Sequence, residues 1–238
     1  MNKLFVATAS AAALLLAASA AAAQPSGYVG ASYADSNDAD AHAWGVEGAA
    51  VFPAGPVQVQ VDAAGSETKV KGFSNDKAFV GTGHVFYRND KWAAGAFVSG
   101  ADQGFYAYGG EGALYLDRVT LSAAVGALRD ESEGGVGNLG TAIGVGGKVF
   151  VTDNFSLGAN YTSLDPKGSG GTLDFWGLAG EYRFDKAPVS VSLGYQRNDD
   201  LDVDAWSIGA RWHFGTGSLK EQDRKGASMG AGSILSLF

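Results

Sequence analysis

The chain has 238 residues, no cysteine and a formal net charge of −8. The lack of cysteine excludes disulfide scaffolds and thiol chemistry, and the acidic balance argues against a nucleic acid partner, because phosphates are bound by basic surfaces. The 36 glycines are about twice the usual share of ~7%, and charged residues make up 18% of the chain, below the ~25% of typical soluble domains.

The first 23 residues have the composition of a secretory signal peptide. Lys3 supplies a positive charge, Leu4 to Ala18 is apolar, and Ala21-Ala22-Ala23 before Gln24 fits the small-residue cleavage site of such peptides. The apolar part is too short for a membrane-spanning helix with these flanks. We therefore predict a cleaved signal peptide over residues 1–23 and a mature protein that works outside the cytoplasm.

After this segment, no apolar run approaches the ~18 residues of a membrane helix, so a chain that crosses a membrane has to do so as a closed barrel. The sequence instead alternates between apolar and polar residues, which indicates strands. Most alternating segments have roughly the 9–11 residues of a tilted membrane strand. The twelve segments are 27–34, 41–52, 57–66, 77–88, 92–100, 104–116, 119–129, 139–151, 155–164, 172–184, 189–197 and 203–214.

Short links between the segments alternate with longer, acidic links. The short links are Pro53 to Pro56, Asn89 to Lys91, Asp117 to Arg118, Thr152 to Asn154 and Asp185 to Pro188, and the longer ones include Asp35 to Asp40, Asp130 to Gly137 and Asn198 to Asp202. Short turns on one rim and long loops on the other are typical of outer-membrane barrels. We predict an all-β fold over residues 24–214, a transmembrane antiparallel up-and-down β-barrel of twelve strands with its short turns on the periplasmic rim.

The two faces of the segments suit a membrane better than water. A soluble sandwich or lipocalin also alternates, but its polar face is usually rich in Lys and Glu. Here the polar face is Gly, Ser, Thr, Asn and Gln with sparse charge. Aromatic residues of the apolar face cluster near both strand ends, which predicts two interfacial girdles: Phe52, Tyr87, Trp92, Phe155, Phe184, Trp212 and Phe214 by the short turns, and Tyr33, Tyr106, Tyr161, Trp176, Tyr195 and Trp206 by the long loops.

The last segment carries a motif that resembles the β-signal of outer-membrane proteins. The pattern is polar, any, glycine, any, any, hydrophobic, any, aromatic, and its defined positions fall on Ser207, Gly209, Trp212 and Phe214. By architecture, residues 24–214 resemble the superfamily of porins and small outer-membrane β-barrels. The resemblance implies insertion into the outer membrane by the barrel assembly machinery.

This chain departs from the usual pattern because 24 residues follow the motif, and Ser233 and Ser236 keep the last eight residues from matching it. Residues 215–238 break the alternation and are predicted to form a periplasmic tail. Their Gly and Ser content favours a disordered extension. The alternative is that the apolar end, Ile234 to Phe238, folds back into the periplasmic mouth and partly plugs the lumen.

Ionisable residues on the inward face are sparse, and most lie a few residues above the short turns. The predicted pore-lining residues are Glu47, Asp62, His84, Glu111, Lys148, Glu181, Arg183 and Arg211, with His213 nearby. If Phe52 pairs with Val57, Glu47 faces Asp62 across a hairpin, with His84 one strand further on. These groups could form structural pairs that fix the register, a constriction that sets ion selectivity, or a dedicated divalent cation site.

A passive porin for ions and small solutes is the function we expect from this pattern. A closed structural barrel whose loops or tail bind a partner is the alternative. An outer-membrane lipid-modifying enzyme would need a nucleophile, a base and an orienting group together at the outer rim, and the three histidines do not converge on such a set. No cofactor or metal motif is present, so we expect no enzyme activity, no cofactor and no metal. The expected partners are outer-membrane lipid and lipopolysaccharide, the assembly machinery and small solutes.

Overall fold

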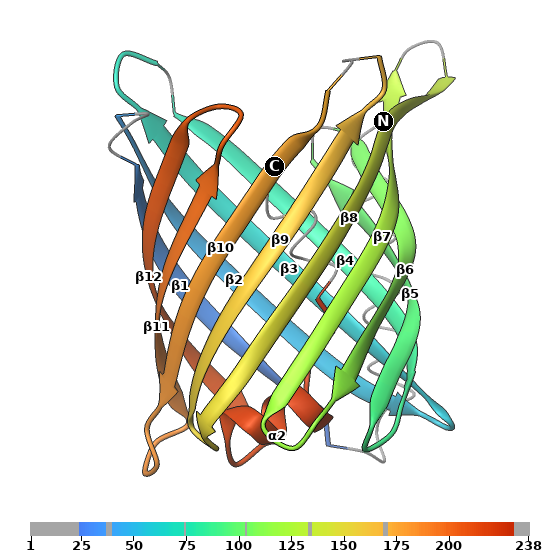
Figure 1. The fold of residues 1–238 in the computed structure, drawn as a ribbon, viewed down its shortest axis with the longest axis vertical. Coiled ribbons are helices and arrows are strands. Elements are labelled where there is room, and N and C mark those ends of the chain that lie inside the picture. The colour runs from blue at the N-terminus through green and yellow to red at the C-terminus, as the bar shows by residue number, and fades with distance from the viewer. Residues whose placement is uncertain are drawn as a thin grey trace.

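The computed structural model describes residues 24–36, 40–73, 75–102, 104–132, 135–168 and 171–230. Within these ranges the chain forms twelve strands and one helix, and the strands close into a single antiparallel barrel (Figure 1). The elements are β1 (Ser26–Ser36), β2 (Ala41–Ala54), β3 (Val57–Val70), β4 (Asp76–Arg88), β5 (Trp92–Ala101), β6 (Phe105–Tyr115), β7 (Val119–Ser132), β8 (Gly135–Thr152), β9 (Phe155–Pro166), β10 (Leu173–Arg183), β11 (Val189–Asn198), β12 (Val203–Phe214) and α2 (Leu219–Lys225). No helix in the described ranges is long and apolar enough to cross a membrane.

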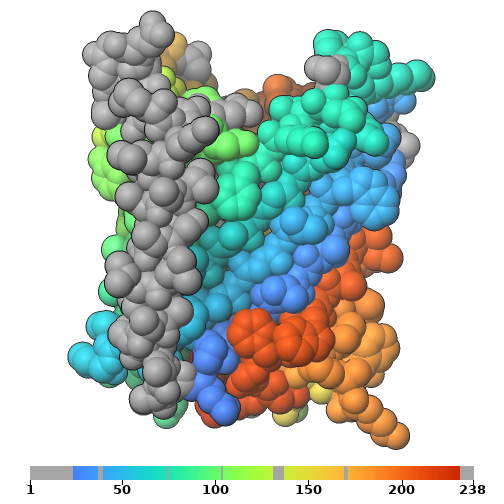
Figure 2. All heavy atoms as spheres, turned by 180° about the vertical axis from the view of Figure 1, so that it is seen from behind, coloured from blue at the N-terminus to red at the C-terminus, as the bar shows by residue number. Residues whose placement is uncertain are grey.

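Each strand pairs with its neighbours in the sequence, and β1 closes the ring by pairing with β12, from Gly27 opposite Phe214 to Asp35 opposite Trp206. In Figure 2 the band of β12 lies against the band of β1, and the bands run diagonally across the outer wall. The predicted number, order and antiparallel pairing of the strands are confirmed. The predicted signal peptide lies outside the described residues.

The five predicted short turns all lie on one rim, which we name the turn rim, and the opposite rim is named the loop rim. The loop rim differs from the prediction because much of its expected loop length is strand. β7 continues to Ser132 and β8 begins at Gly135, so the predicted loop from Asp130 to Gly137 is a hairpin in which these two residues pair. Hairpins therefore project unevenly from this rim (Figure 1).

The hairpin between β2 and β3 corrects the predicted register. Ala54 pairs with Val57 and Phe52 pairs with Val59, so the turn has two residues instead of four. Gly55 adopts a φ of +67°, a left-handed conformation that lets Gly55 and Pro56 reverse the chain alone. The predicted pairing of Glu47 with Asp62 is therefore wrong: Glu47 lies opposite Ala64, and Asp62 opposite Ala49. The shift is two residues, so both carboxylates keep their inward face.

The outer face of the barrel is apolar along the strands. Val46, Val98, Leu193 and Ile208 expose between 58% and 64% of their surface, although all four lie in the middle of strands. A soluble protein rarely exposes a continuous apolar surface of this kind. A lipid bilayer covers such a surface, and barrel closure leaves no strand edge unpaired within it.

Aromatic rings of this outer face contact one another near both rims. The ring pairs at the turn rim are Tyr87 with Trp92, Tyr182 with Phe184 and Trp212 with Phe214, and those at the loop rim are Tyr33 with Trp44, Trp176 with Tyr195 and Tyr195 with Trp206. Amphipathic rings prefer the boundary between lipid and water. The spacing of the two groups along the strands therefore defines the segment of the wall that lies in the hydrocarbon.

Glycines of the inner wall make room for aromatic side chains. A Cβ atom added to Gly109 would lie 1.9 Å from the carbonyl oxygen of Val125 and 2.9 Å from the ring of Phe97. A Cβ atom at Gly126, on the neighbouring strand, would lie 3.0 Å from the same ring. Phe97 therefore lies along the wall of β6 and β7, over two glycines, and is buried there.

We predict that Gly109→Ala destabilises the barrel by about 1–3 kcal/mol, because the added methyl group overpacks the contact with Val125 and Phe97. The matched control is Gly83→Ala, since a Cβ atom at Gly83 meets no atom within 4 Å. The measurement is unfolding of the detergent-solubilised barrel in denaturant, followed by its heat-modifiable migration on gels. Equal midpoints for the two variants would contradict this account of the inner wall.

Candidate functional site

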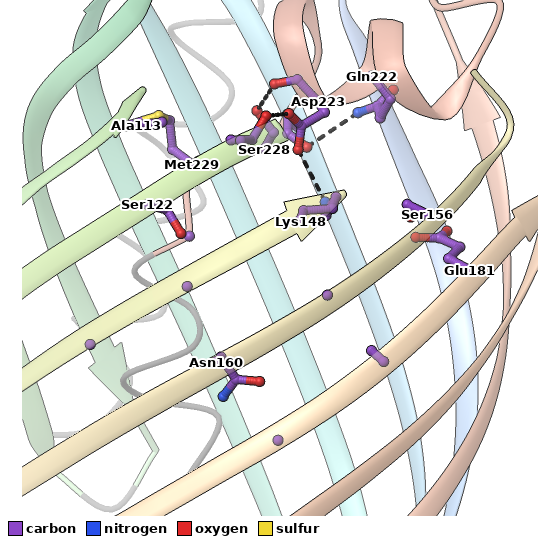
Figure 3. Close-up of a pocket in the computed structure, with 18 of the residues that line it drawn as sticks. Ala113, Ser122, Lys148, Ser156, Asn160, Glu181, Gln222, Asp223, Ser228 and Met229 are labelled. Atoms are coloured by element: carbon purple, nitrogen blue, oxygen red, sulfur yellow. Dashed lines mark hydrogen bonds and ion pairs between the residues drawn. The ribbon is translucent and has the colours of Figure 1, made fainter. Parts of the chain in front are cut away.

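The barrel encloses a cavity of about 700 Å³ that is lined by residues of every strand except β5. Its lining on β8 to β11 consists largely of residues with little or no side chain, including Gly144, Gly146, Gly158, Gly177 and Gly194. Nearer the loop rim, side chains of β5 to β9 form a buried cluster of Phe97, Ala107, Ala124, Leu128, Ala142 and Leu164. The open space therefore follows the glycine-rich wall (Figure 3).

The first polar cluster of the lumen joins β3, β4 and β6 through His84. The Nδ1 atom of His84 lies 2.6 Å from Oε1 of Glu111, and its Nε2 atom lies 2.9 Å from Oδ2 of Asp62. Gln60 donates to both carboxylate oxygens of Asp62, at 2.8 and 3.0 Å. The side chain of His84 is wholly buried, whereas that of Asp62 is 21% exposed, so Asp62 is the member of the ion pair that reaches the cavity.

The second cluster joins β2, β10 and β12 through Arg211. Its guanidinium group donates from Nε to Glu47 at 2.6 Å and from Nη1 to Glu181 at 3.3 Å. The same group lies 4.7 Å from the centroid of the Tyr28 ring. Arg211 thus pairs with two carboxylates from different strands, which leaves one net negative charge, and about a third of its side chain still faces the cavity.

A serine, a histidine and a carboxylate also meet beside this cluster, but not as a catalytic triad. Ser190 donates to Glu181 at 2.6 Å, and its Oγ atom lies 2.8 Å from Nε2 of His213. In a triad the acid orients the other ring nitrogen, whereas Nδ1 of His213 has no hydrogen-bond partner among the described residues. Both Ser190 and His213 are buried, so the geometry suits a structural contact.

The third cluster involves the helix that follows the barrel. Asp223 of α2 accepts a hydrogen bond from Lys148 at 3.1 Å (Figure 3) and another from Thr120 at 2.6 Å. Asp223 is 6% exposed, and the Lys148 side chain is 41% exposed to the cavity. A carboxylate from outside the barrel wall therefore completes the charge pairing of the lumen.

The segment after β12 forms the floor of the cavity. Ser218 caps α2 by accepting a hydrogen bond from the backbone of Glu221, and the side chain of Glu221 accepts one from the backbone of Gly217. Leu219, Gln222 and Asp223 are the buried face of the helix, at helical spacing. The expectation of a disordered extension is wrong for this part of residues 215–238, and the apolar end at 234–238 lies outside the described residues.

The structure divides the predicted site residues among these clusters. Those that line the cavity are Glu47, Asp62, Glu111, Lys148, Glu181 and Arg211. His84 is buried behind its two carboxylates, and Arg183 is buried where it donates to the backbone oxygen of Thr216 at 2.7 Å. The contribution of Asp223 was not predicted from the sequence. The pattern Ser218-x-x-Glu221, followed by helix-forming residues and Gly226, is the signal that would have predicted α2.

The loop rim is acidic, but part of its charge is neutralised locally. Arg197 contacts Asp199 at 2.6 Å and Asp202 at 2.7 Å, and the first of these hydrogen bonds holds the pKa of Asp199 below its ordinary value. Lys71 contacts Asp40 at 3.3 Å. The attraction that this rim exerts on cations is therefore weaker than the number of its carboxylates suggests.

Comparisons with known proteins agree with this architecture. Residues 80–219 match the family described as Gram-negative porin. A search of curated proteins returns no match. Among solved structures, the KdgM porin gives a TM-score of 0.60 at 10% identity, covering 79% of this chain and 99% of that one. The NanC porin gives 0.56 at 9% identity, covering 78% and 98%, and an outer membrane channel from Pseudomonas putida F1 gives 0.52 at 11%, covering 79% and 96%.

At these identities the solved structures establish the fold, whereas the family match extends over more than half of the chain, from β4 to the start of α2. The closed barrel, its apolar outer face and its polar lumen are the features that this family requires. The chain therefore belongs to the Gram-negative porin family and is an outer-membrane channel for small solutes.

Proposed function

We propose that the chain is a passive diffusion channel that favours cations and small polar solutes of low charge. The observation that supports this most directly is the composition of the cavity lining. It includes five carboxylates, from Glu47, Asp62, Glu111, Glu181 and Asp223, but only two permanent cations, Lys148 and Arg211. An excess of carboxylates in a pore raises the local concentration of cations and repels anions.

The same lining argues against a polyanionic solute. One structure similar to this chain is the KdgM porin in complex with disordered oligogalacturonate, which is a polyanionic sugar. In this chain Arg211 is already shared by two carboxylates, and Lys148 is paired with Asp223. A polyanion would have to displace these internal partners, so we do not extend that ligand to this channel.

The channel itself is tested by planar-bilayer recording. We expect the refolded protein to give stepwise ion currents, since ions and water fit the glycine-lined side of the lumen. The recording is made with the full chain and with a chain that ends at Phe214. If neither of them conducts, the proposal of a channel is refuted and the closed structural barrel becomes the better explanation.

The cation preference is tested by removing two lining charges together. We expect Glu47→Gln with Asp62→Asn to lower the cation-to-anion permeability ratio about two- to fivefold, because the double variant removes two negative charges from a partly aqueous lumen. The measurement is the reversal potential in a salt gradient. The matched control is Asp90→Asn, an exposed carboxyl group outside the lining. An unchanged ratio in the double variant would leave these carboxylates a purely structural role.

We also propose that β12 directs assembly through Ser207, Gly209, Trp212 and Phe214, and that the assembly machinery is the partner that recognises them. Outer-membrane lipid and lipopolysaccharide are the proposed partners of the apolar wall and the loop rim. The pairing of β12 with β1 supports the assembly role, because the last strand closes the ring. The proposal does not require residues 215–238, which follow the motif.

Deleting residues 215–238 is expected to leave the amount of folded protein in the outer membrane unchanged, whereas Phe214→Ser is expected to reduce it severalfold. Phe184→Ser is the matched control, because Phe184 is an exposed aromatic residue at the same rim but lies outside the motif. The readout is the heat-modifiable fraction in outer-membrane preparations. Loss of folded protein on deletion, or equal loss with Phe184→Ser and Phe214→Ser, would refute the internal signal.

A further inference from the structure

The segment that follows β12 crosses the mouth of the barrel at the turn rim. At one end, the backbone of Leu219 donates to Asn154 and that of Lys220 donates to the backbone of Asp153, between β8 and β9. At the other end, Met229 contacts Gln60 of β3. β9 and β3 are six strands apart in a ring of twelve, so the segment spans the mouth from one wall to the opposite one (Figure 1).

The wall is built to receive this segment. Gln60 accepts hydrogen bonds from the backbone N–H groups of Ser228 and Met229, at 3.0 and 3.1 Å, and donates to the backbone oxygen of Met229 at 3.0 Å. Arg88 donates to the backbone oxygen of Gly226 at 2.8 Å and to the hydroxyl group of Ser228 at 3.0 Å. Gln60 is 1% exposed, so both ends of its amide are committed to the segment and to Asp62.

Asp223 is the charged contact at the centre of the span. It is buried between Thr120 of β7 and Lys148 of β8. The segment also makes apolar contacts with the wall. Ala227 and Met229 join a buried cluster with Phe86, Tyr115, Ala49, Val51 and Ala93 of the wall. The hydrogen bond from Thr120 and the ion pair with Lys148 therefore favour the seated position of Asp223.

The barrel does not need this segment to complete its own wall. β12 pairs with β1 and β11 along its length, and all twelve strands have two neighbours without it. Inside the lumen, residues 218–230 contact wall side chains, and at the rim they contact turns between strands, at Asn154 and Asp117. The segment can therefore leave its position without breaking a strand pair, so it is not a structural part of the barrel wall.

From this geometry we propose that residues 217–230 form a displaceable plug, seated by Asp223, Gln60 and Arg88, that restricts solute passage at the turn rim. The inference rests on the proposed channel function and deepens it. Gly215, at a φ of +76°, and Thr216, held by Arg183, form the fixed point from which the plug extends. The cavity above it remains open to the glycine-lined wall, and the plug forms its floor.

The plug is tested first by conductance. Asp223→Lys places a cation against Lys148, and we expect it to raise single-channel conductance about twofold or more, with a similar rise on deletion of residues 215–238. Asp90→Lys is the matched control, because it makes the same substitution at an exposed position in the β4–β5 turn. Conductance that is equal in the wild type, Asp223→Lys and the deletion would overturn the plug while leaving the channel intact.

The seating of the plug is also tested by cysteine labelling, which does not depend on conductance. The chain contains no cysteine, so an introduced cysteine supplies the single reactive thiol. Met229 is 5% exposed, so the thiol of Met229→Cys should react slowly with an impermeant maleimide, and adding Asp223→Lys should make it react fast. Lys225→Cys on the exposed face of α2 should react fast in both backgrounds. Fast labelling of Met229→Cys in the otherwise wild-type barrel would overturn the plug. If the wild type, Asp223→Lys and the deletion all fail to conduct, the proposed channel function is refuted. The proposal that the plug restricts solute passage is then refuted as well, whatever the labelling shows.

Discussion

Closure of the backbone hydrogen-bond ladder is the constraint on which the rest of this structure depends. In lipid, each unpaired N–H or C=O group costs several kcal/mol, so a sheet can span a membrane only as a ring. The pairing of β1 with β12 meets this requirement and fixes the inward or outward direction of every side chain. The apolar exterior, the polar lumen and the position of the two rims follow from it.

Once the wall is closed, the lumen has to accommodate its charges without bulk water on every side. It does so in compact groups: His84 between two carboxylates, Arg211 between two carboxylates, and Lys148 with the carboxylate of Asp223. Each group joins strands that are not sequence neighbours or joins the wall to α2, so the same contacts that neutralise charge also hold the shape of the barrel. The remaining excess of carboxylates faces the cavity, where it acts on ions in transit.

The shape of the cavity depends on where bulky and small inward residues lie along the strands. Phe97, Leu128 and their neighbours fill space toward the loop rim, whereas the glycines of β8 to β11 leave space beside the wall. The C-terminal segment then limits this space from below. The glycines determine where a solute can pass because they have no side chains to fill the lumen. They therefore define this channel as much as the charged residues do.

The sequence by itself determined the strand number, most strand bounds at the turn rim to within two residues, the rim on which the five short turns lie and the inward face of the ionisable strand residues in the three clusters, because period-2 alternation is a local property. It also contained the capping pattern at Ser218 and Glu221 that starts α2. Only the tertiary structure decided which inward charges meet. Glu47 contacts Arg211 instead of Asp62, because the partner across a barrel depends on ring closure and on a left-handed glycine in one turn. The seating of Asp223 between Thr120 and Lys148 likewise depends on residues about 75 and 103 positions away in the chain, a separation that no local pattern encodes.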